Sequence, residues 1–388
     1  MASFRSGWSA RRVARQFRVS LSTVQFWLAR AGSKRLDDVD WTDRSSRPHH
    51  VPTRTPRSTR AALGRLRRQL ARDDLGFIGA PVVQAAFRRL HPHAPVPAIA
   101  TIHRILRAQG FMDRVHRRRT AAPPPGWYLP AHSSAPPELD RFDLIEGLGL
   151  GEAGPFDVLT GRALWDDSRL AVPAPHWSAR SIATQLLQHW QHHGRPAYAQ
   201  FDNDLRFHGS RHPPGSLGRI VRLCLGLGIV PVFAPPRESG FQAGIEHFNG
   251  LWQRQVWQRF EFRTLTQVQQ RSARFVLAYM RLLRQRGTEP PAARSAFPLG
   301  WRPDYRTVPH GRVFFLRRTN ERGFIEVLNH RLRADPDWPH RLLRCELELP
   351  AQILRCYRLR RRAPADQPLV ATLPLPCCLG PIRLGRLD

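Results

Sequence analysis

Proline-rich stretches divide this chain of 388 residues into separate folding units. The longest, at 120–137, reads TAAPPPGWYLPAHSSAPP. Proline fixes φ and lacks a backbone N–H, so such a stretch interrupts helices and central strands. A chain of this length also exceeds one ordinary domain. We therefore expect several modules joined by linkers at 49–57, 120–137 and 291–310.

The modules between these linkers differ in the period of their apolar residues. Residues 1–48 and 58–119 carry helical spacing, whereas 138–290 alternates strand-like and helix-like runs. Residues 311–388 contain short strand-like runs such as RVFFLRRT and RLLRCELEL. The sequence predicts a multidomain fold with N-terminal all-α helix-turn-helix modules, a central α/β core and a C-terminal small β-barrel.

The first module has the pattern of two helices joined by a tight turn. The first predicted helix places three apolar side chains on one face: Val13, Ala14 and Phe17. After a break at Arg18, the second helix begins with Ser20 or Ser22 as its N-cap. Its predicted outward side chains are Ser22, Thr23, Gln25, Phe26 and Arg30, and the polar ones are candidate DNA contacts. A plain helical hairpin with a basic face is the alternative.

The charge of the chain predicts a polyanionic partner. Lys and Arg number 61 against 30 Asp and Glu, a formal net charge of +31, and Lys34 is the only lysine. Guanidinium groups match phosphate oxygens in pairs, so a nucleic acid is the expected partner. Further candidate contacts are Arg44 and Arg47 in the basic linker, and Arg104 and Arg107 in the last helix of 58–119. An uncommitted tether and a structural spacer are the alternatives for these two segments.

Neither a membrane nor an oxidising compartment is indicated. The chain opens without an apolar signal-peptide core, and no apolar run approaches the roughly 18 residues of a membrane span. The five cysteines lack C-x-x-C spacing. We expect a soluble, cytoplasmic protein.

Three acids in 138–290 are candidates for metal binding. Asp143 lies within an apolar strand pattern, Asp202 ends the strand-like run PAYAQF, and Glu246 lies on a predicted helix. A carboxylate in a core strand is costly unless a partner, a proton or a metal compensates it. Two strand acids and one helix acid are what a two-metal phosphoryl-transfer site requires. Turn formation and helix capping are the alternative roles for such acids.

The strips FDLIEGL, FDNDLRFHGS and PPRESGFQAGIEHFNGLWQ resemble the DDE transposases of bacterial insertion sequences, which have a retroviral-integrase-like core. The resemblance implies a ribonuclease-H-like core, two Mg²⁺ or Mn²⁺ ions when DNA is bound, and joining of element ends to target DNA. It implies Asp143, Asp202 and Glu246 as catalytic metal ligands, with Asn249 and Arg254 as further DNA contacts. A homo-oligomer acting at the bacterial nucleoid is also implied.

The spacing of the last two acids departs from that family. Many members place these acids closer together, and Glu238, at 238 − 202 = 36, fits the shorter spacing better than Glu246, at 246 − 202 = 44. We prefer Glu246 because its sequence context matches, whereas Glu238 lies between Pro236 and Gly240. The alternative functions are a catalytically inactive DNA-binding protein on the same scaffold and, more distantly, a ribonuclease-like or repair nuclease.

Overall fold

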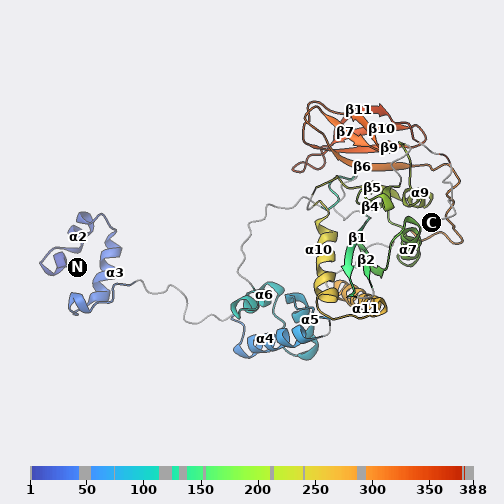
Figure 1. Cartoon of the computed structure of the whole chain (residues 1–388). Coiled ribbons are helices and arrows are strands. Elements are labelled where there is room, and N and C mark those ends of the chain that lie inside the picture. The colour runs from blue at the N-terminus through green and yellow to red at the C-terminus, as the bar shows by residue number, and fades with distance from the viewer. Residues whose placement is uncertain are drawn as a thin grey trace. The chain divides into compact units, whose positions relative to one another are not determined.

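The computed structural model describes residues 2–42, 54–73, 75–112, 125–130, 138–151, 154–209, 214–238, 241–285, 294–377 and 380. The chain divides into two compact units, Met1–Pro56 and Arg57–Asp388 (Figure 1). Each unit has its own apolar core.

The first unit is the predicted helical pair with a short helix before it. Its elements are α1 (Ala2–Arg5), α2 (Ala10–Gln16), α3 (Leu21–Ala31) and the 3₁₀ turn η1 (Leu36–Asp38). Ser20 caps α3 by accepting a hydrogen bond from the Thr23 backbone N–H at 3.1 Å, as serine does at an N-cap. Val13 and Ala14 are buried, whereas Phe17, which lines the same hollow as Val13, is 59% exposed.

Three helices begin the second unit, as predicted for 58–119: α4 (Arg57–Arg72), α5 (Ala80–Leu90) and α6 (Ile99–Ala108). Ile102, Ile105 and Leu106 of α6 are buried in their common core, whereas Ile99, at the first turn, is exposed. These helices do not form a compact unit of their own. Phe77, between α4 and α5, packs against Phe275 and Tyr279 of the following core at ring distances of 5.5 and 5.6 Å.

A mixed sheet forms the centre of the second unit. Its first strands are β1 (Leu139–Gly149), β2 (Pro155–Ala163), β3 (Arg169–Ala174), β4 (Tyr198–Phe201) and β5 (Val230–Phe233). They are ordered β3-β2-β1-β4-β5, with β1, β2 and β3 antiparallel and β4 and β5 parallel to β1. This is the central α/β core that the alternating patterns predicted.

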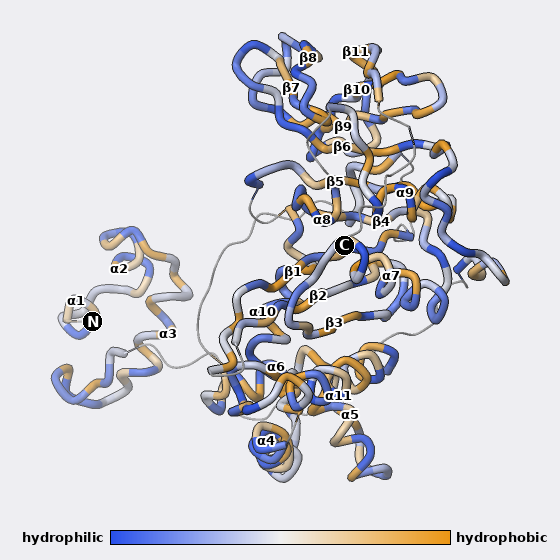
Figure 2. The backbone as a smooth tube through the Cα atoms, turned by 45° about the vertical axis from the view of Figure 1, so that its right-hand side comes forward, coloured by the Kyte–Doolittle hydropathy of each residue, from blue (hydrophilic) through white to orange (hydrophobic). Residues whose placement is uncertain are grey.

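Helices cover both faces of this sheet. The helices are α7 (Ala179–His193), α8 (Leu205–His208), α9 (Arg219–Gly226), α10 (Ala243–Trp252), its π-helical continuation η3 (Gln253–Trp257) and α11 (Leu265–Arg284). Apolar residues of α7 and α9 pack on one face, and those of α10 and α11 pack on the other (Figure 1). Apolar and polar stretches alternate along the helices in Figure 2, which fits elements with one face on the sheet.

The predicted C-terminal barrel is not confirmed. The strands β6 (Arg312–Arg318), β9 (Leu342–Glu348), β10 (Ile353–Arg358) and β11 (Leu369–Pro374) continue the central sheet beyond β5. The hairpin of β7 (Phe324–Val327) and β8 (His330–Arg333) forms a separate two-stranded sheet. Their apolar side chains belong to the same core cluster as α7 and α9, because the parallel pairing of β5 with β6 makes the two parts continuous.

The predicted linker at 291–310 contains a buried anchor. Arg294 donates two hydrogen bonds of 2.8 Å to the carboxylate of Asp140, and its Nε lies 2.7 Å from Asp166. The side chains of Arg294 and Asp140 are 2% and 1% exposed. The segment therefore packs on the core from Arg294 onward. No helix in the described ranges combines the length and apolarity that a bilayer crossing requires.

Candidate active site

The parallel pairing of β1 with β4 sets the first two candidate acids side by side. Arg141 of β1 pairs with Gln200 of β4. Asp143 and Asp202 each follow two residues later, and side chains two residues apart point to the same face of a strand. That face is the one under α10, because Asn249 of α10 donates a hydrogen bond of 2.8 Å to Asp143. The strand order thus brings together two acids 59 positions apart (202 − 143).

The surroundings of Asp143 disfavour the ionised form of its carboxyl group. Burial, followed by the neighbouring charge of Asp202 and a smaller contribution from Glu246, raises its pKa to about 6. Hydrogen bonds from the Leu144 backbone N–H, at 3.0 Å, and from Asn249 act in the opposite direction. The pKa of Asp143 therefore records the proximity of both other candidate acids.

Asp202 is likewise half-buried, and burial is the main cause of its raised pKa. Its carboxylate accepts a hydrogen bond of 3.0 Å from the Asp204 backbone N–H, which fixes the turn after β4. In the part of the chain that the structure describes, neither Asp143 nor Asp202 forms an ion pair with an arginine. In so arginine-rich a chain, two adjacent unpaired carboxylates leave room for a cation.

Glu246 and Glu238 lie in different surroundings. Glu246 occupies the first turn of α10, exposed, three residues before Asn249 and therefore on the same side of the helix. Glu238 forms an ion pair with Arg318 of β6. Of these two glutamates, Glu246 is therefore the one whose charge raises the pKa of Asp143. Glu238 is paired with the last residue of β6.

The three acids do not close on one point. Over the ranges that the structure describes, no group of three His, Cys, Asp or Glu side chains is arranged to hold a single metal ion. Asp202 is the acid that most raises the pKa of Asp143, and Glu246 also stands within electrostatic reach of Asp143. The donor set consists of carboxylate oxygens, which suit the hard cation Mg²⁺.

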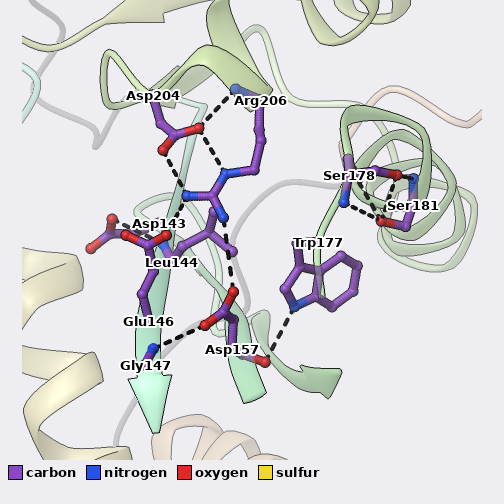
Figure 3. Close-up of polar contacts among 10 residues, drawn as sticks. All are labelled: Asp143, Leu144, Glu146, Gly147, Asp157, Trp177, Ser178, Ser181, Asp204 and Arg206. Atoms are coloured by element: carbon purple, nitrogen blue, oxygen red, sulfur yellow. Dashed lines mark hydrogen bonds and ion pairs between the residues drawn. The ribbon is translucent and has the colours of Figure 1, made fainter. Parts of the chain in front are cut away.

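Arg206 of α8 holds the turn that carries Asp202. Its guanidinium bonds both oxygens of Asp204 at 2.8 and 2.7 Å and reaches Glu146 of β1 and, at 3.9 Å, Asp157 of β2 (Figure 3). The Arg206 contacts lower the pKa of Asp204. The Arg206 side chain thus links the loop after β4 to β1 and β2.

The candidate DNA contacts are distributed over both units. Ser22, Thr23 and Gln25 of α3 are exposed, as predicted. Arg30 is not outward: its side chain is 7% exposed, pairs with Asp40 at 3.3 Å and donates to the Thr42 carbonyl at 2.6 Å.

The remaining candidates separate into exposed, half-buried and undescribed positions. Arg104 and Arg254 are exposed, and Arg107 is half-buried. Arg44 and Arg47 lie outside the described residues. Asn249 is half-buried and hydrogen-bonded to Asp143, because α10 lies directly over β1, and its contact with DNA stays a prediction.

Sequence reasoning missed the basic side chains around the acids. Arg141 and Arg162 lie on the same face as Asp143, Arg206 binds the turn after β4, and Arg294 anchors Asp140. The alternation in DRFD was a usable signal for Arg141, since a strand points Arg141 and Asp143 the same way. Arg206 and Arg294 had no such signal, because their partners are distant in sequence.

Comparison with known proteins gives remote structural similarity alone. No family model matches the sequence, and no curated protein matches it. Similar solved structures include the catalytic core domain of BIV integrase, 17% identical, covering 36% of this chain and 82% of that chain with a TM-score of 0.28. A chain of the simian T-cell lymphotropic virus intasome in complex with the PP2A regulatory subunit B56 gamma is 12% identical, covering 78% and 96%, with a TM-score of 0.32.

A third similar structure is the HTLV-2 integrase catalytic core domain in complex with magnesium, 11% identical, covering 36% of this chain and 86% of that chain with a TM-score of 0.28. Identities and TM-scores this low do not establish a family or an activity for the chain.

Proposed function

We propose that this protein is a DDE-type DNA transposase or integrase that cleaves phosphodiester bonds and joins element ends to target DNA. The observation that carries the proposal is the pair Asp143 and Asp202, adjacent and without an arginine partner among the described residues. The formal charge of +31 supplies the attraction to DNA. The strand order β3-β2-β1-β4-β5 supports a ribonuclease-H-like core for it.

The acids fit a divalent metal by their chemistry. Burial raises the pKa of both half-buried carboxylates, and the charge of Asp202 further raises that of Asp143, so a cation that neutralises them would stabilise the site. Asp143, Asp202 and Glu246 would hold Mg²⁺ or Mn²⁺, with two ions present when DNA is bound. Such ions, when bound, activate the attacking oxygen and stabilise the leaving oxygen in phosphoryl transfer.

The other residues of the site would orient these ligands. Asn249 holds Asp143 by one carboxylate oxygen and leaves the other toward the Leu144 N–H. Arg206 fixes the turn after β4 and so the direction of Asp202. Glu246, on the exposed first turn of α10, would complete the set when that turn moves toward β1.

Double-stranded DNA would be held by both units. The exposed side chains Ser22, Thr23 and Gln25 of α3 would contact the DNA as those of a recognition helix do. Arg104 and Arg254 would contact the phosphate backbone. Joining two element ends implies that more than one copy acts together, as in a bacterial insertion-sequence transposase at the nucleoid.

The test is metal-dependent cleavage and joining by the purified full chain. We expect nicking and strand transfer of the DNA ends that flank its coding region in the presence of Mg²⁺, and neither reaction with Asp202→Asn. Glu261→Gln, an exposed acid after η3, serves as the matched control and retains activity. Equal products from wild type and Asp202→Asn would contradict the proposal.

A second candidate is a DNA-binding protein without catalysis on the same scaffold. It is favoured by the absence, over the described ranges, of three acids arranged around one ion. It predicts binding that weakens steeply with salt and no metal-dependent cleavage. The same assay separates the two candidates.

A further inference from the structure

A row of arginines crosses the sheet beside the acids. Arg141 of β1 pairs in register with Arg162 of β2, and Arg162 pairs with Arg169 of β3. All three side chains lie on the face under α10 and α11, the face of Asp143. Arg141 and Asp143 are two residues apart on β1, a spacing of about 7 Å. This spacing is comparable with the distance between neighbouring phosphates of one nucleic-acid strand.

This arginine row is costly for the fold. Arg141 and Arg169 are 6% and 7% exposed, and like charges directly opposite each other on a sheet are destabilising. Burial and then the charge of Arg141 lower the pKa of Arg162, and burial and then the charge of Arg162 lower that of Arg169 to about 10. Arg169 is occupied by three backbone carbonyls.

Among the described residues, Arg141 and Arg162 have no anionic partner. Arg141 bonds the hydroxyl of Tyr128 at 3.2 Å, and Arg162 donates to the Gly244 carbonyl at 2.6 Å. No carboxylate contacts either guanidinium among the residues that the structure describes. The buried Nε atoms of both side chains have no hydrogen-bond partner there. The uncompensated charge therefore points to an anion that the described residues do not provide.

Both guanidinium groups are directed at the start of α10. A Cβ atom built on Gly244 would lie 2.9 Å from Nη1 of Arg162 and 3.0 Å from Nη1 of Arg141. Glycine leaves that approach open. Among the described residues, no side chain caps this helix at Gln242, and Oε1 of Gln242 is buried without a partner. A helix N-terminus carries partial positive charge and free N–H groups, which adds to the two arginines.

We propose that Arg141, Arg162 and the first turn of α10 form a phosphate-binding site. Its ligand is a phosphate group of a nucleic-acid strand, next to the phosphodiester on which the acids act. The nature of that ligand rests on the proposed function, whereas the capacity to bind phosphate does not. The site would also fix the turn of α10 that carries Glu246, because Gly244 precedes Glu246 by two residues.

The test measures phosphate binding without catalysis. Full-length Asp202→Asn protein, free of metal, is titrated with inorganic phosphate by calorimetry at constant ionic strength, with chloride as the balancing salt. Arg141→Gln and Arg162→Gln, each in this background, are expected to weaken binding at least tenfold. Arg361→Gln, an exposed arginine remote from the row in sequence, serves as the control and leaves binding unchanged.

A second pair of variants protects the test against unfolding. Arg162→Lys keeps the charge and is expected to bind phosphate more tightly than Arg162→Gln, with circular dichroism confirming the fold of both. Equal phosphate affinity in the Asp202→Asn protein and in the same protein with Arg162→Gln added overturns the site. A single-stranded oligonucleotide with a 5′-phosphate should show the same ranking of variants, and a ranking seen only with free phosphate overturns the nucleic-acid ligand. Phosphate binding is measured in the Asp202→Asn protein, which is not expected to cleave DNA. The binding result therefore does not depend on the outcome of the cleavage assay.

Discussion

Nδ2 of Asn249 donates a hydrogen bond of 2.8 Å to Oδ2 of Asp143 and so joins α10 to the central strand β1. Glu246 lies three residues before Asn249, about one helical turn. The contact therefore holds the helix that carries Glu246 against the strand that carries Asp143. Asn249 Oδ1 is buried without a partner in the described structure, so the amide is held on one side only.

Replacing Asn249 by alanine should raise the pKa of Asp143 and weaken metal binding there without unfolding the protein. The hydrogen bond lowers the pKa of Asp143, so its loss raises that pKa above about 6. The acid limb of the pH–rate profile for nicking should move to higher pH. The Mg²⁺ concentration for half-maximal rate should rise by about 10- to 100-fold, as for other residues that orient metal ligands. Gln253→Ala, the next turn of the same helix, is the control, and an unchanged profile would count against the positioning role.

Replacing Asp143 by asparagine should stabilise the metal-free protein at neutral pH. The folded pKa of Asp143, about 6, lies above its ordinary value of 3.8. The folded state therefore binds the proton more tightly, and ionisation costs stability as pH rises from about 4 to about 6. The cost above that window is about 3 kcal/mol.

Asp143→Asn should accordingly unfold at higher urea than wild type at pH 7.5 and at the same urea at pH 3.5. Addition of Mg²⁺ should stabilise wild type and leave the variant unchanged, because only a carboxylate pair attracts the ion strongly. Glu261→Gln should behave as wild type at both pH values. A variant less stable than wild type at pH 7.5 would show that the cost of ionising Asp143 is overstated.

Replacing Arg206 by glutamine should loosen the turn after β4. Asp204, Glu146 and Asp157 would then face one another without their shared cation. Arg206 lowers the pKa of Asp204, so the stability from this contact is present above the ordinary pKa of Asp204 and is lost as pH falls through the lowered value. The melting temperature should fall at pH 7.5, and the difference from wild type should shrink toward pH 3. A difference independent of pH would assign the effect to packing instead.

Replacing Arg294 by alanine should lower the free energy of unfolding of the protein. The carboxylate of Asp140 would remain buried without its bidentate partner, which costs about 3–5 kcal/mol. Urea unfolding of Arg294→Ala should show that loss. The double variant Asp140→Leu/Arg294→Met removes both charges and should recover most of the stability. If the double variant is no better than Arg294→Ala, the ion pair is not the reason for the loss.

Local patterns in the sequence predicted the elements that depend on near neighbours. The serine N-cap of α3 and the buried pair Val13 and Ala14 follow from short-range spacing. The strand around Asp143 and the helix of Glu246 follow from the period of their apolar residues. These features need only the residues within a few positions of each other.

Relations between distant segments were decided by the tertiary structure. The pairing of β5 with β6 turned a predicted separate barrel into an extension of the central sheet, and Arg294 turned a predicted linker into a buried anchor. Arg30 faces inward because Asp40 and Thr42 return to it. The sequence alone determined which residues alternate on a strand. Which strands lie side by side, and so which charges meet, was set by the free energy of packing the whole core, which no short window contains.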